Sequence, residues 1–217
     1  RDGQRSWAEE ITDLAGPHYP TTLWRAGEVL LGLHDLTVPR DAPSGVYDLV
    51  AELLDGEDMV SSHILGTLTV INHPRRFESP AFARPSGAQW GGRIALLGYD
   101  LRAEGAEVSA TLHWQAQATV ETSYTLFIHL LDTMGRIWAQ ADSLPVGGDY
   151  PTTSWLPGQV VSDAYRLVPQ EGALSGEYWL AIGWYDLEPG LRLPVYDAQG
   201  QRQPDDRLLI GPLALER

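Results

Sequence analysis

Aromatic and histidine side chains recur at alternate positions on two apolar runs in the C-terminal part of the chain. Phe127 and His129 lie on one run, and Trp179 and Tyr185 lie on the other. Because successive side chains of a strand point to opposite faces, these residues would share the face opposite the core. His113, on a neighbouring run, has the same parity. Aromatic rings rimmed by polar groups suit the flat face of a sugar ring, so we predict a glycan-binding surface here. The alternative is that the linker or the N-terminal part of the chain covers this face, because large exposed apolar patches are uncommon.

Tyr150 and Trp155 belong to a phrase that the chain contains twice. It reads Tyr19-Pro20-Thr21-Thr22-Leu23-Trp24 and, 131 residues later, Tyr150-Pro151-Thr152-Thr153-Ser154-Trp155. In one interpretation the rings of Tyr150 and Trp155 stack on a sugar, and both residues therefore join the predicted ligand-binding set. In the interpretation that we favour, the phrase is a corner that closes the end of a sandwich, because large aromatic side chains dominate core energetics.

Metal and catalytic chemistry have weaker support in the sequence. His113 and His129 could be cross-strand neighbours, but a zinc site would need a third ligand such as Asp142. Acidic turns at residues 55–58 and 205–206 lack the alternating order of oxygen ligands that a calcium loop needs. The chain contains no nucleophile elbow, zinc-protease motif, phosphate loop or dinucleotide fingerprint. We therefore expect no catalytic residue, no metal and no cofactor; a glycoside hydrolase would need two acids facing each other across a cleft.

The repeated phrase is part of a longer duplication, which sets the domain organisation. At the same spacing Trp7 corresponds to Trp138, Gly27 to Gly158, and residues 44–47 to residues 175–178. A tandem repeat of this kind predicts two structural units. We predict a partial unit over residues 1–72, a Pro-rich linker over 73–92 and a complete unit over 93–217. The first copy has no counterpart of residues 93–131, so it is expected to be N-terminally truncated.

Short apolar or alternating runs separated by Gly, Pro and Asp predict strands and little helix. The fold class that we predict is all-β, with two tandem immunoglobulin-like antiparallel β-sandwich units. In the second unit the expected strands are 94–101, 107–116, 123–131, 137–142, 160–168, 177–185, 193–196 and 208–215. In the first they are 5–12, after a hairpin turn at residues 1–4, and then 28–38, 46–55, 59–64 and 66–71. Prolines in the linker are expected to exclude a central strand there.

The truncated unit would leave a sheet edge uncovered. We therefore expect the linker, the second unit or another copy of the chain to cover this edge, and the last of these would make the protein a homo-oligomer.

The charge of the chain excludes some partners. Its net charge is −14, and all 15 basic residues are Arg. Acidic surfaces argue against binding to the phosphate backbone of nucleic acids and against docking on anionic membrane surfaces. No apolar run approaches the roughly 20 residues of a membrane helix, so we expect no direct membrane insertion by this segment. Without cysteine, neither a disulfide nor a thiolate metal site can form.

Several motifs resemble a known bacterial module. They are Leu97-Gly98-Tyr99-Asp100-Leu101, Leu112-His113-Trp114-Gln115-Ala116, Phe127-Ile128-His129-Leu130-Leu131-Asp132, Gly147-Gly148-Asp149-Tyr150-Pro151-Thr152, Ser175-Gly176-Glu177-Tyr178 and Gly183-Trp184-Tyr185-Asp186. Together they resemble a β-sandwich module found, often in tandem, after the multi-spanning membrane region of proteins similar to dolichyl-phosphate-mannose-type glycosyltransferases in Chloroflexota-like bacteria. The resemblance covers residues 93–215 fully and 1–71 as a truncated copy.

The resemblance implies a location on the extracytoplasmic side of a bacterial cytoplasmic membrane. It also implies a non-catalytic accessory domain of a membrane-anchored glycosyltransferase, which binds a bacterial glycan or polysaccharide or positions an acceptor. Since a module of one fold can serve many functions, the alternative is a structural spacer or protein–protein interaction module without a ligand.

Overall fold

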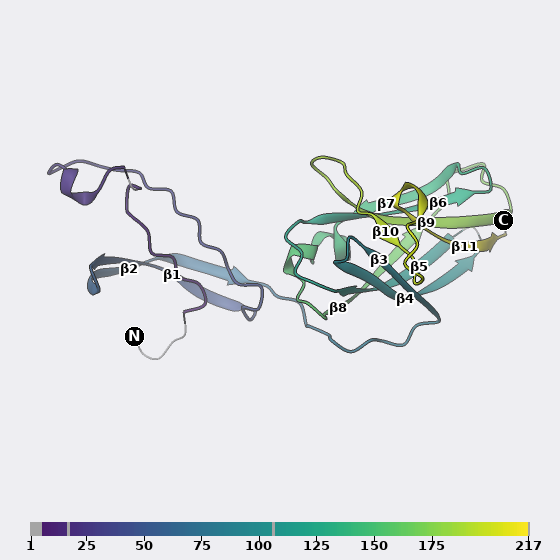
Figure 1. Ribbon diagram of the computed structural model, residues 1–217, viewed down its shortest axis with the longest axis horizontal. Coiled ribbons are helices and arrows are strands. Elements are labelled where there is room, and N and C mark those ends of the chain that lie inside the picture. Colours follow the sequence, from purple (N-terminus) through teal and green to yellow (C-terminus); the bar gives the residue numbers. More distant parts are fainter. Residues whose placement is uncertain (1–5, 17, 106, 217) are drawn as a thin grey trace. The chain divides into compact units, whose positions relative to one another are not determined.

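A computed structural model describes residues 6–16, 18–105 and 107–216, and the chain divides into two compact units (Figure 1). The first unit is Arg1–Asn72 and the second is His73–Arg217. Both are built from antiparallel strands, and the described residues contain only short 3-10 helices. The predicted all-β class is therefore confirmed. None of the described residues forms a helix of the length and apolarity needed to span a membrane.

Two antiparallel sheets form the second unit. In spatial order, the five-stranded sheet contains β10 (Val195–Tyr196), β3 (Arg84–Trp90), β4 (Ile94–Glu104), β5 (Glu107–Ala116) and β8 (Val160–Leu167). The four-stranded sheet contains β11 (Leu208–Leu215), β9 (Gly176–Asp186), β6 (Tyr124–Asp132) and β7 (Ile137–Ser143). Three 3-10 helices connect them, η2 (Pro145–Gly148), η3 (Thr152–Ser154) and η4 (Pro204–Asp206). The two strands predicted at 107–116 and 208–215 have the observed bounds.

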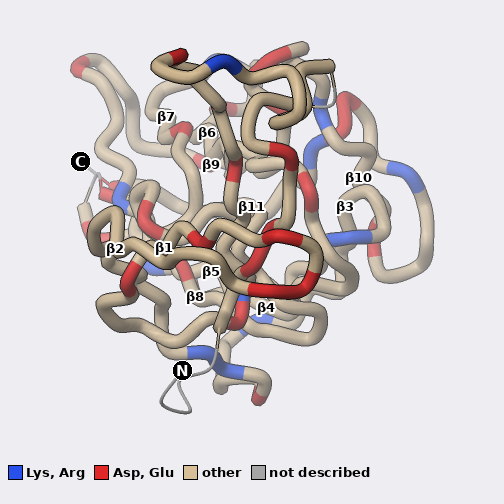
Figure 2. The backbone as a smooth tube through the Cα atoms, turned by 90° about the vertical axis from the view of Figure 1, so that its left-hand side faces the viewer, with Lys and Arg blue, Asp and Glu red and all other residues tan. Residues whose placement is uncertain are grey.

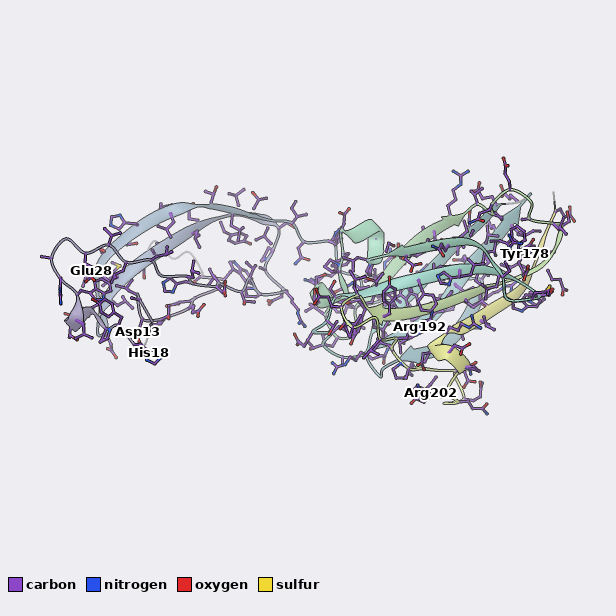
Figure 3. The ribbon with its side chains drawn as sticks, turned by 90° about the horizontal axis from the view of Figure 1, so that it is seen from above. Asp13, His18, Glu28, Tyr178, Arg192 and Arg202 are labelled. Carbon is purple, nitrogen blue, oxygen red and sulfur yellow. The ribbon has the colours of Figure 1, made fainter. Side chains whose placement is uncertain are left out.

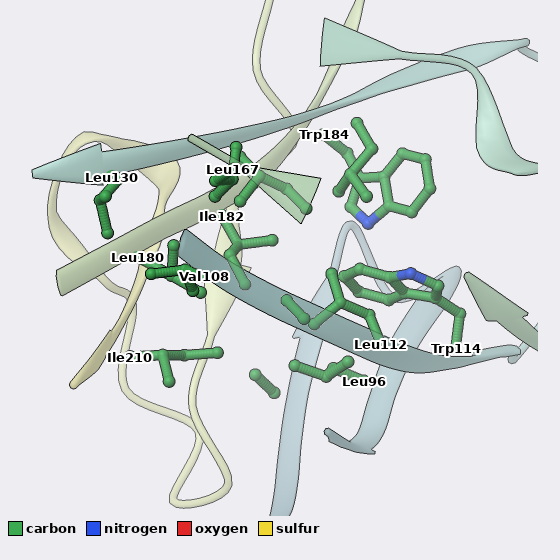
Figure 4. Close-up of a cluster of buried hydrophobic side chains, with 14 of the residues drawn as sticks. Leu96, Val108, Leu112, Trp114, Leu130, Leu167, Leu180, Ile182, Trp184 and Ile210 are labelled. Carbon is green, nitrogen blue, oxygen red and sulfur yellow. The ribbon is translucent and has the colours of Figure 1, made fainter. Parts of the chain in front are cut away.

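The core of the second unit consists of the alternate residues that the two sheets turn toward each other. On β5 every second residue from Val108 to Ala116 is buried, as its alternating pattern predicts. β6 and β9 supply further aliphatic side chains and Trp184 (Figure 4). The ring of Trp114 packs edge-on against Trp90 and Trp184, with centroid distances of 5.3 and 5.0 Å. Each large side chain that is fully buried in this way contributes about 1.5–3 kcal/mol to folding.

The segment predicted to be a linker, residues 73–92, contains a strand over residues 84–90. These residues form β3, which pairs with β4, and they belong to the second compact unit. Only Gln89 and Trp90 of β3 also pair with β10, so Pro85 lies on a stretch of β3 that forms the sheet edge. A proline is tolerated at an edge because its missing N–H faces no neighbouring strand. Trp90 at the other end of β3 is fully buried, and it anchors this segment in the core.

The first unit contains a single hairpin among its described residues. β1 (Gly45–Asp55) pairs with β2 (Asp58–Val70), and η1 (Thr21–Leu23) precedes them. The strand predicted at 28–38 and the described part of the one predicted at 5–12 do not form, and the hairpin turn predicted at 1–4 lies outside the described residues. In the second unit, the equivalents of the two missing strands are β8 and β7, which bond to β5 and β6. Among the described residues of the first unit, no strand occupies the position of β5 or β6. The expectation that the linker, the second unit or another copy of the chain covers the sheet edge of the first unit stays a prediction.

The repeated phrase adopts the same local structure in both units. In each copy the Trp indole N–H donates to the Tyr carbonyl oxygen, Trp24 to Tyr19 and Trp155 to Tyr150, over 3.1 Å in both cases. Trp155 is fully buried, whereas Trp24 is only partly buried. The phrase therefore folds locally in both copies, and among the described residues the tryptophan of the second copy is the one that fills a core.

A second hydrogen bond recurs in both units, at the start of the equivalent strands β1 and β9. The hydroxyl of Tyr47 donates to the carbonyl of Pro43, and that of Tyr178 (Figure 3) donates to the carbonyl of Leu174, both over 2.7 Å. β1 and β9 begin at equivalent residues, Gly45 and Gly176. The duplication thus extends from the sequence to individual hydrogen bonds.

Candidate functional site

Tyr150 and Trp155 close the core and do not lie on a binding surface. Trp155 is fully buried and meets the ring of Trp184 edge-on, with 6.0 Å between the centroids. Tyr150 is 5% exposed, and its hydroxyl accepts a hydrogen bond from the side-chain amide of Gln159. Neither ring has a face open to a ligand, contrary to their inclusion in the ligand-binding set. Their position agrees with the interpretation of the phrase as a corner.

Three of the predicted site residues, Phe127, His129 and Tyr185, come together on the outer face of the four-stranded sheet. There they line a pocket of about 230 Å³, here called the outer-face pocket. Its lining consists of Phe127, His129, Asp142, Tyr185, Gly190 and Arg192. These side chains come from β6, β7 and β9 and from the loop that follows β9. Regular strands hold most of the site, so its geometry follows from sheet register.

Phe127 forms the floor of the outer-face pocket. It pairs in register with Gly183 on β9 and with Asp142 on β7. A Cβ atom at position 183 would stand 2.4 Å from the Phe127 ring, so only glycine leaves room for it. The guanidinium of Arg192 lies 4.5 Å from the ring centroid on the cation–π face. Phe127 is therefore only 2% exposed, and the expectation that it offers an open stacking surface is wrong. The sequence pattern places it on the outer face, but the loop after β9 covers it.

Polar groups converge on Asp142 at the rim of the pocket. Nε2 of His129 lies 3.3 Å from Oδ1 of Asp142, and the hydroxyl of Tyr185 donates to Oδ2 over 3.4 Å. Asp142 remains exposed to about a third of its side-chain surface, at 37%. A carboxylate can accept about four hydrogen bonds, so Asp142 retains capacity for a ligand. Arg192 (Figure 3) donates to the carbonyl of Asp205 over 3.0 Å, which fixes the side chain above the floor.

The protonation states in the pocket follow from burial and charge. Burial lowers the pKa of His129, and the charges of Arg192 and Arg207 act in the same direction, while Asp142 opposes them. Burial and the charge of Asp142 raise the pKa of the Tyr185 hydroxyl. At neutral pH the imidazole of His129 and the phenol of Tyr185 are therefore neutral, and they lie beside the side chains of Asp142 and Arg192. This set combines hydrogen-bond donors and acceptors in a small space, as a ligand rich in hydroxyl groups requires.

Trp179 lies on the same sheet but away from the pocket. It pairs in register with Leu131, whereas Tyr185 pairs with Thr125 near the other end of β9. Its ring lies against Gly211 on β11, where an added Cβ would come within 2.8 Å of it. Trp179 is partly exposed and does not line the outer-face pocket.

His113 lies on the five-stranded sheet, where it pairs with an aspartate as His129 does on the four-stranded sheet. Its Nε2 lies 3.1 Å from Oδ2 of Asp100, its Nδ1 lies 2.8 Å from Oγ of Ser162, and the ring of Phe82 lies 5.9 Å from the His113 ring. The predicted cross-strand pairing of His113 with His129 is wrong, because β5 and β6 belong to different sheets. Within the described ranges, no three His, Asp or Glu side chains gather in a way that could hold a metal ion.

The sequence pattern does not predict two of the pocket residues. Arg192 and Gly190 belong to the loop after β9, where strand parity does not apply. Asp142 entered only as a possible third metal ligand. The signal that could have pointed to Arg192 is the long stretch between β9 and β11, since long loops with little regular structure are often functional.

The fold and the outer-face pocket define an all-β sandwich module with a small, polar surface site. No known family model and no curated protein matches the chain. Among solved structures, the crystal structure of the C-terminal domain of wzt is similar, with 13% sequence identity and a TM-score of 0.40. The similarity covers 63% of this chain and 85% of that chain. At these values, function has to be argued from the site itself.

Proposed function

We propose that the second unit is a non-catalytic glycan-binding accessory module, in which the outer-face pocket holds one sugar residue of a bacterial polysaccharide. The observation that carries the proposal is the convergence of His129 and Tyr185 on Asp142, with Arg192 in the same lining, in a concavity of about 230 Å³. Pockets for drug-sized ligands are larger, about 300–1,000 Å³, so the size suits a single ring better than several.

The chemistry of the lining favours a hydroxyl-rich ligand. Asp142 can accept hydrogen bonds from adjacent sugar hydroxyls, while Arg192 and Tyr185 are donors. Acidic residues are spread along the chain (Figure 2), which disfavours nucleic-acid ligands. Glycoside hydrolysis commonly needs two carboxyl groups flanking the bond, whereas the lining contains one, Asp142. Binding without cleavage is therefore the function that this set of residues supports.

The setting of the module is part of the same proposal. The resemblance of residues 93–215 to the module that follows the membrane region of glycosyltransferase-like proteins supports a role on the extracytoplasmic side of a bacterial membrane. In that setting the pocket would hold a growing or acceptor glycan near a membrane-anchored parent protein. A structural spacer without a ligand is the alternative, and it predicts an outer-face pocket that binds no sugar.

Isothermal titration calorimetry with purified mannan, dextran, galactan and a polyuronate tests the proposal. The wild-type chain is expected to bind at least one of them. Asp142→Asn is expected to weaken that binding about 10- to 100-fold, since a hydrogen bond to a charged group is worth about 1.5–3 kcal/mol. Asp100→Asn is the matched control, because Asp100 forms a similar pair with His113 outside the pocket. Equal affinities of all three proteins, or no binding at all, would contradict the proposal.

A further inference from the structure

Arg192 is held in the outer-face pocket by neutral groups. Its backbone forms an isolated antiparallel bridge with Tyr185, its guanidinium lies over the Phe127 ring, and one of its N–H groups donates to the backbone carbonyl of Asp205. Among the described residues, the ion pairs between arginine and aspartate or glutamate do not include Arg192. Its positive charge is therefore available to a ligand.

Two other arginines contact the same turn, η4, and both are paired with its aspartates. Nη2 of Arg207 lies 3.1 Å from Oδ2 of Asp205. Nη2 of Arg202 (Figure 3) lies 2.9 and 3.1 Å from the two carboxylate oxygens of Asp206. The turn thus binds two arginines through its carboxylates and Arg192 through a carbonyl oxygen, so the charges of its aspartates are already paired with other residues.

The guanidinium of Arg192 retains hydrogen-bond donors for a ligand. A guanidinium has five N–H donors, and the contacts with Phe127 and Asp205 use the ring face and one N–H. Arg192 is exposed and lines the pocket. The planar fork of arginine matches a carboxylate, to which it donates two parallel hydrogen bonds. The pocket can therefore bind an anionic group at Arg192.

Asp142 limits which anion fits beside Arg192. Both residues line the same small pocket, and the charge of Asp142 acts on His129 there. A phosphate group carries about 1.5 to 2 negative charges at pH 7, so Arg192 alone would not balance it against Asp142. A carboxylate carries one charge, which Arg192 balances. The hydroxyl groups of the same ligand can donate to Asp142.

We infer that the sugar residue held by the outer-face pocket is a uronic acid, whose carboxylate binds Arg192 and whose hydroxyl groups donate to Asp142. The inference rests on the proposed function and adds the class of ligand. The net charge of −14 does not prevent this contact, because charges on the surface more than about 8 Å away are largely screened at physiological ionic strength.

Calorimetry with matched ligands tests the inference. The ligands are oligomers of galacturonate, glucuronate and mannuronate, and the methyl ester of each. Esterification removes the negative charge and keeps the ring hydroxyl groups. The wild-type chain is expected to bind at least one acid about 10- to 100-fold more tightly than its ester, as for a hydrogen bond to a charged group. This comparison uses the wild-type chain and does not depend on how a variant folds.

Two arginine variants locate the preference for the acid. Arg192→Gln should remove most of it, whereas Arg166→Gln should leave it unchanged. Arg166→Gln removes the same charge from the second unit, but Arg166 pairs with Glu107 on the five-stranded sheet, outside the pocket.

The outcomes separate this inference from the proposed function. Binding of an ester as tightly as its acid, binding of neutral polysaccharides alone, or a preference that Arg192→Gln leaves intact would overturn the inference and leave the proposed function standing. Absence of binding to every acid and every neutral polysaccharide would overturn both.

Discussion

Nε2 of His129 lies 3.3 Å from Oδ1 of Asp142, and the two residues come from neighbouring strands, β6 and β7. The other sheet of the second unit contains a similar pair, with Nε2 of His113 lying 3.1 Å from Oδ2 of Asp100. The two pairs differ in what surrounds them. Phe82 and Ser162 pack on His113, whereas His129 and Asp142 border a pocket that Tyr185 and Arg192 complete. One pair therefore has a structural role and serves as the reference for the other.

The pKa of His129 is expected to fall when Asp142 loses its charge. Burial already lowers this pKa, and the carboxylate of Asp142 is what raises it. In Asp142→Asn, burial and the nearby arginine charges still lower the pKa of His129, so His129 should titrate at a lower pH than in the wild-type chain. NMR titration of the His129 Cε1–H signal measures the shift, and Asp100→Asn should leave that signal's titration unchanged. An unchanged or raised pKa in Asp142→Asn would show that the two side chains do not interact in solution.

His129 should also make folding stability depend on pH in mildly acidic solution. Because its pKa is lower in the folded state than in the unfolded state, the unfolded chain binds more protons near about pH 6. Stability is therefore complete above the unfolded-state pKa and declines as the pH falls through it. His129→Gln should flatten this part of the stability–pH profile, measured by urea unfolding at a series of pH values. A stability–pH profile of His129→Gln as steep as that of the wild type would contradict this prediction.

Gly183→Ala should damage the floor of the outer-face pocket. The added methyl would stand 2.4 Å from the Phe127 ring and 3.0 Å from the carbonyl oxygen of Asp206. Overpacking of this kind costs about 1–3 kcal/mol of stability, and it should also displace Phe127 and weaken polysaccharide binding. Gly176→Ala on the same strand is the control, because no atom lies within 4 Å of its added Cβ. Equal melting temperatures for the two variants would mean that the strands separate enough to accept a side chain at position 183.

Truncating the two tryptophans of the repeated phrase should have unequal effects. Trp155 is fully buried in the second unit, so Trp155→Ala should lower that unit's free energy of unfolding by about 3–5 kcal/mol. Trp24 is only partly buried and belongs to the first unit, so Trp24→Ala should leave the unfolding of the second unit unchanged. Chemical denaturation followed by circular dichroism compares them. A comparable loss in both variants would show that the units do not unfold separately.

Strand parity made much of the second unit predictable. β5 has the predicted bounds of 107–116 because its alternating residues meet one core face and one outer face. The same rule fails for residues 28–38, which have the composition of a strand but no neighbouring strand among the described residues. β3 could not be predicted from parity either, because the prolines suggest a linker and the sequence does not show that Pro85 would lie at a sheet edge. A strand depends on its partners as well as on its own residues.

The candidate site was predictable only in part, for a related reason. Parity placed Phe127, His129 and Tyr185 on the outer face, and the structure brings them together. It could not show that Arg192 folds over Phe127, because this contact joins a strand to a loop. The predicted stacking surface is therefore a pocket in which polar groups surround a covered ring.

NMR of the histidine side chains during addition of polysaccharide tests the central claim most directly. Both His113 and His129 form a pair with an aspartate, but only His129 lines the outer-face pocket. When a polysaccharide that binds the chain is added, the His129 signal is expected to shift in proportion to occupancy while the His113 signal stays in place. A bound polysaccharide that leaves His129 unshifted, or shifts His113 as much, would contradict the assignment of the outer-face pocket as the glycan site.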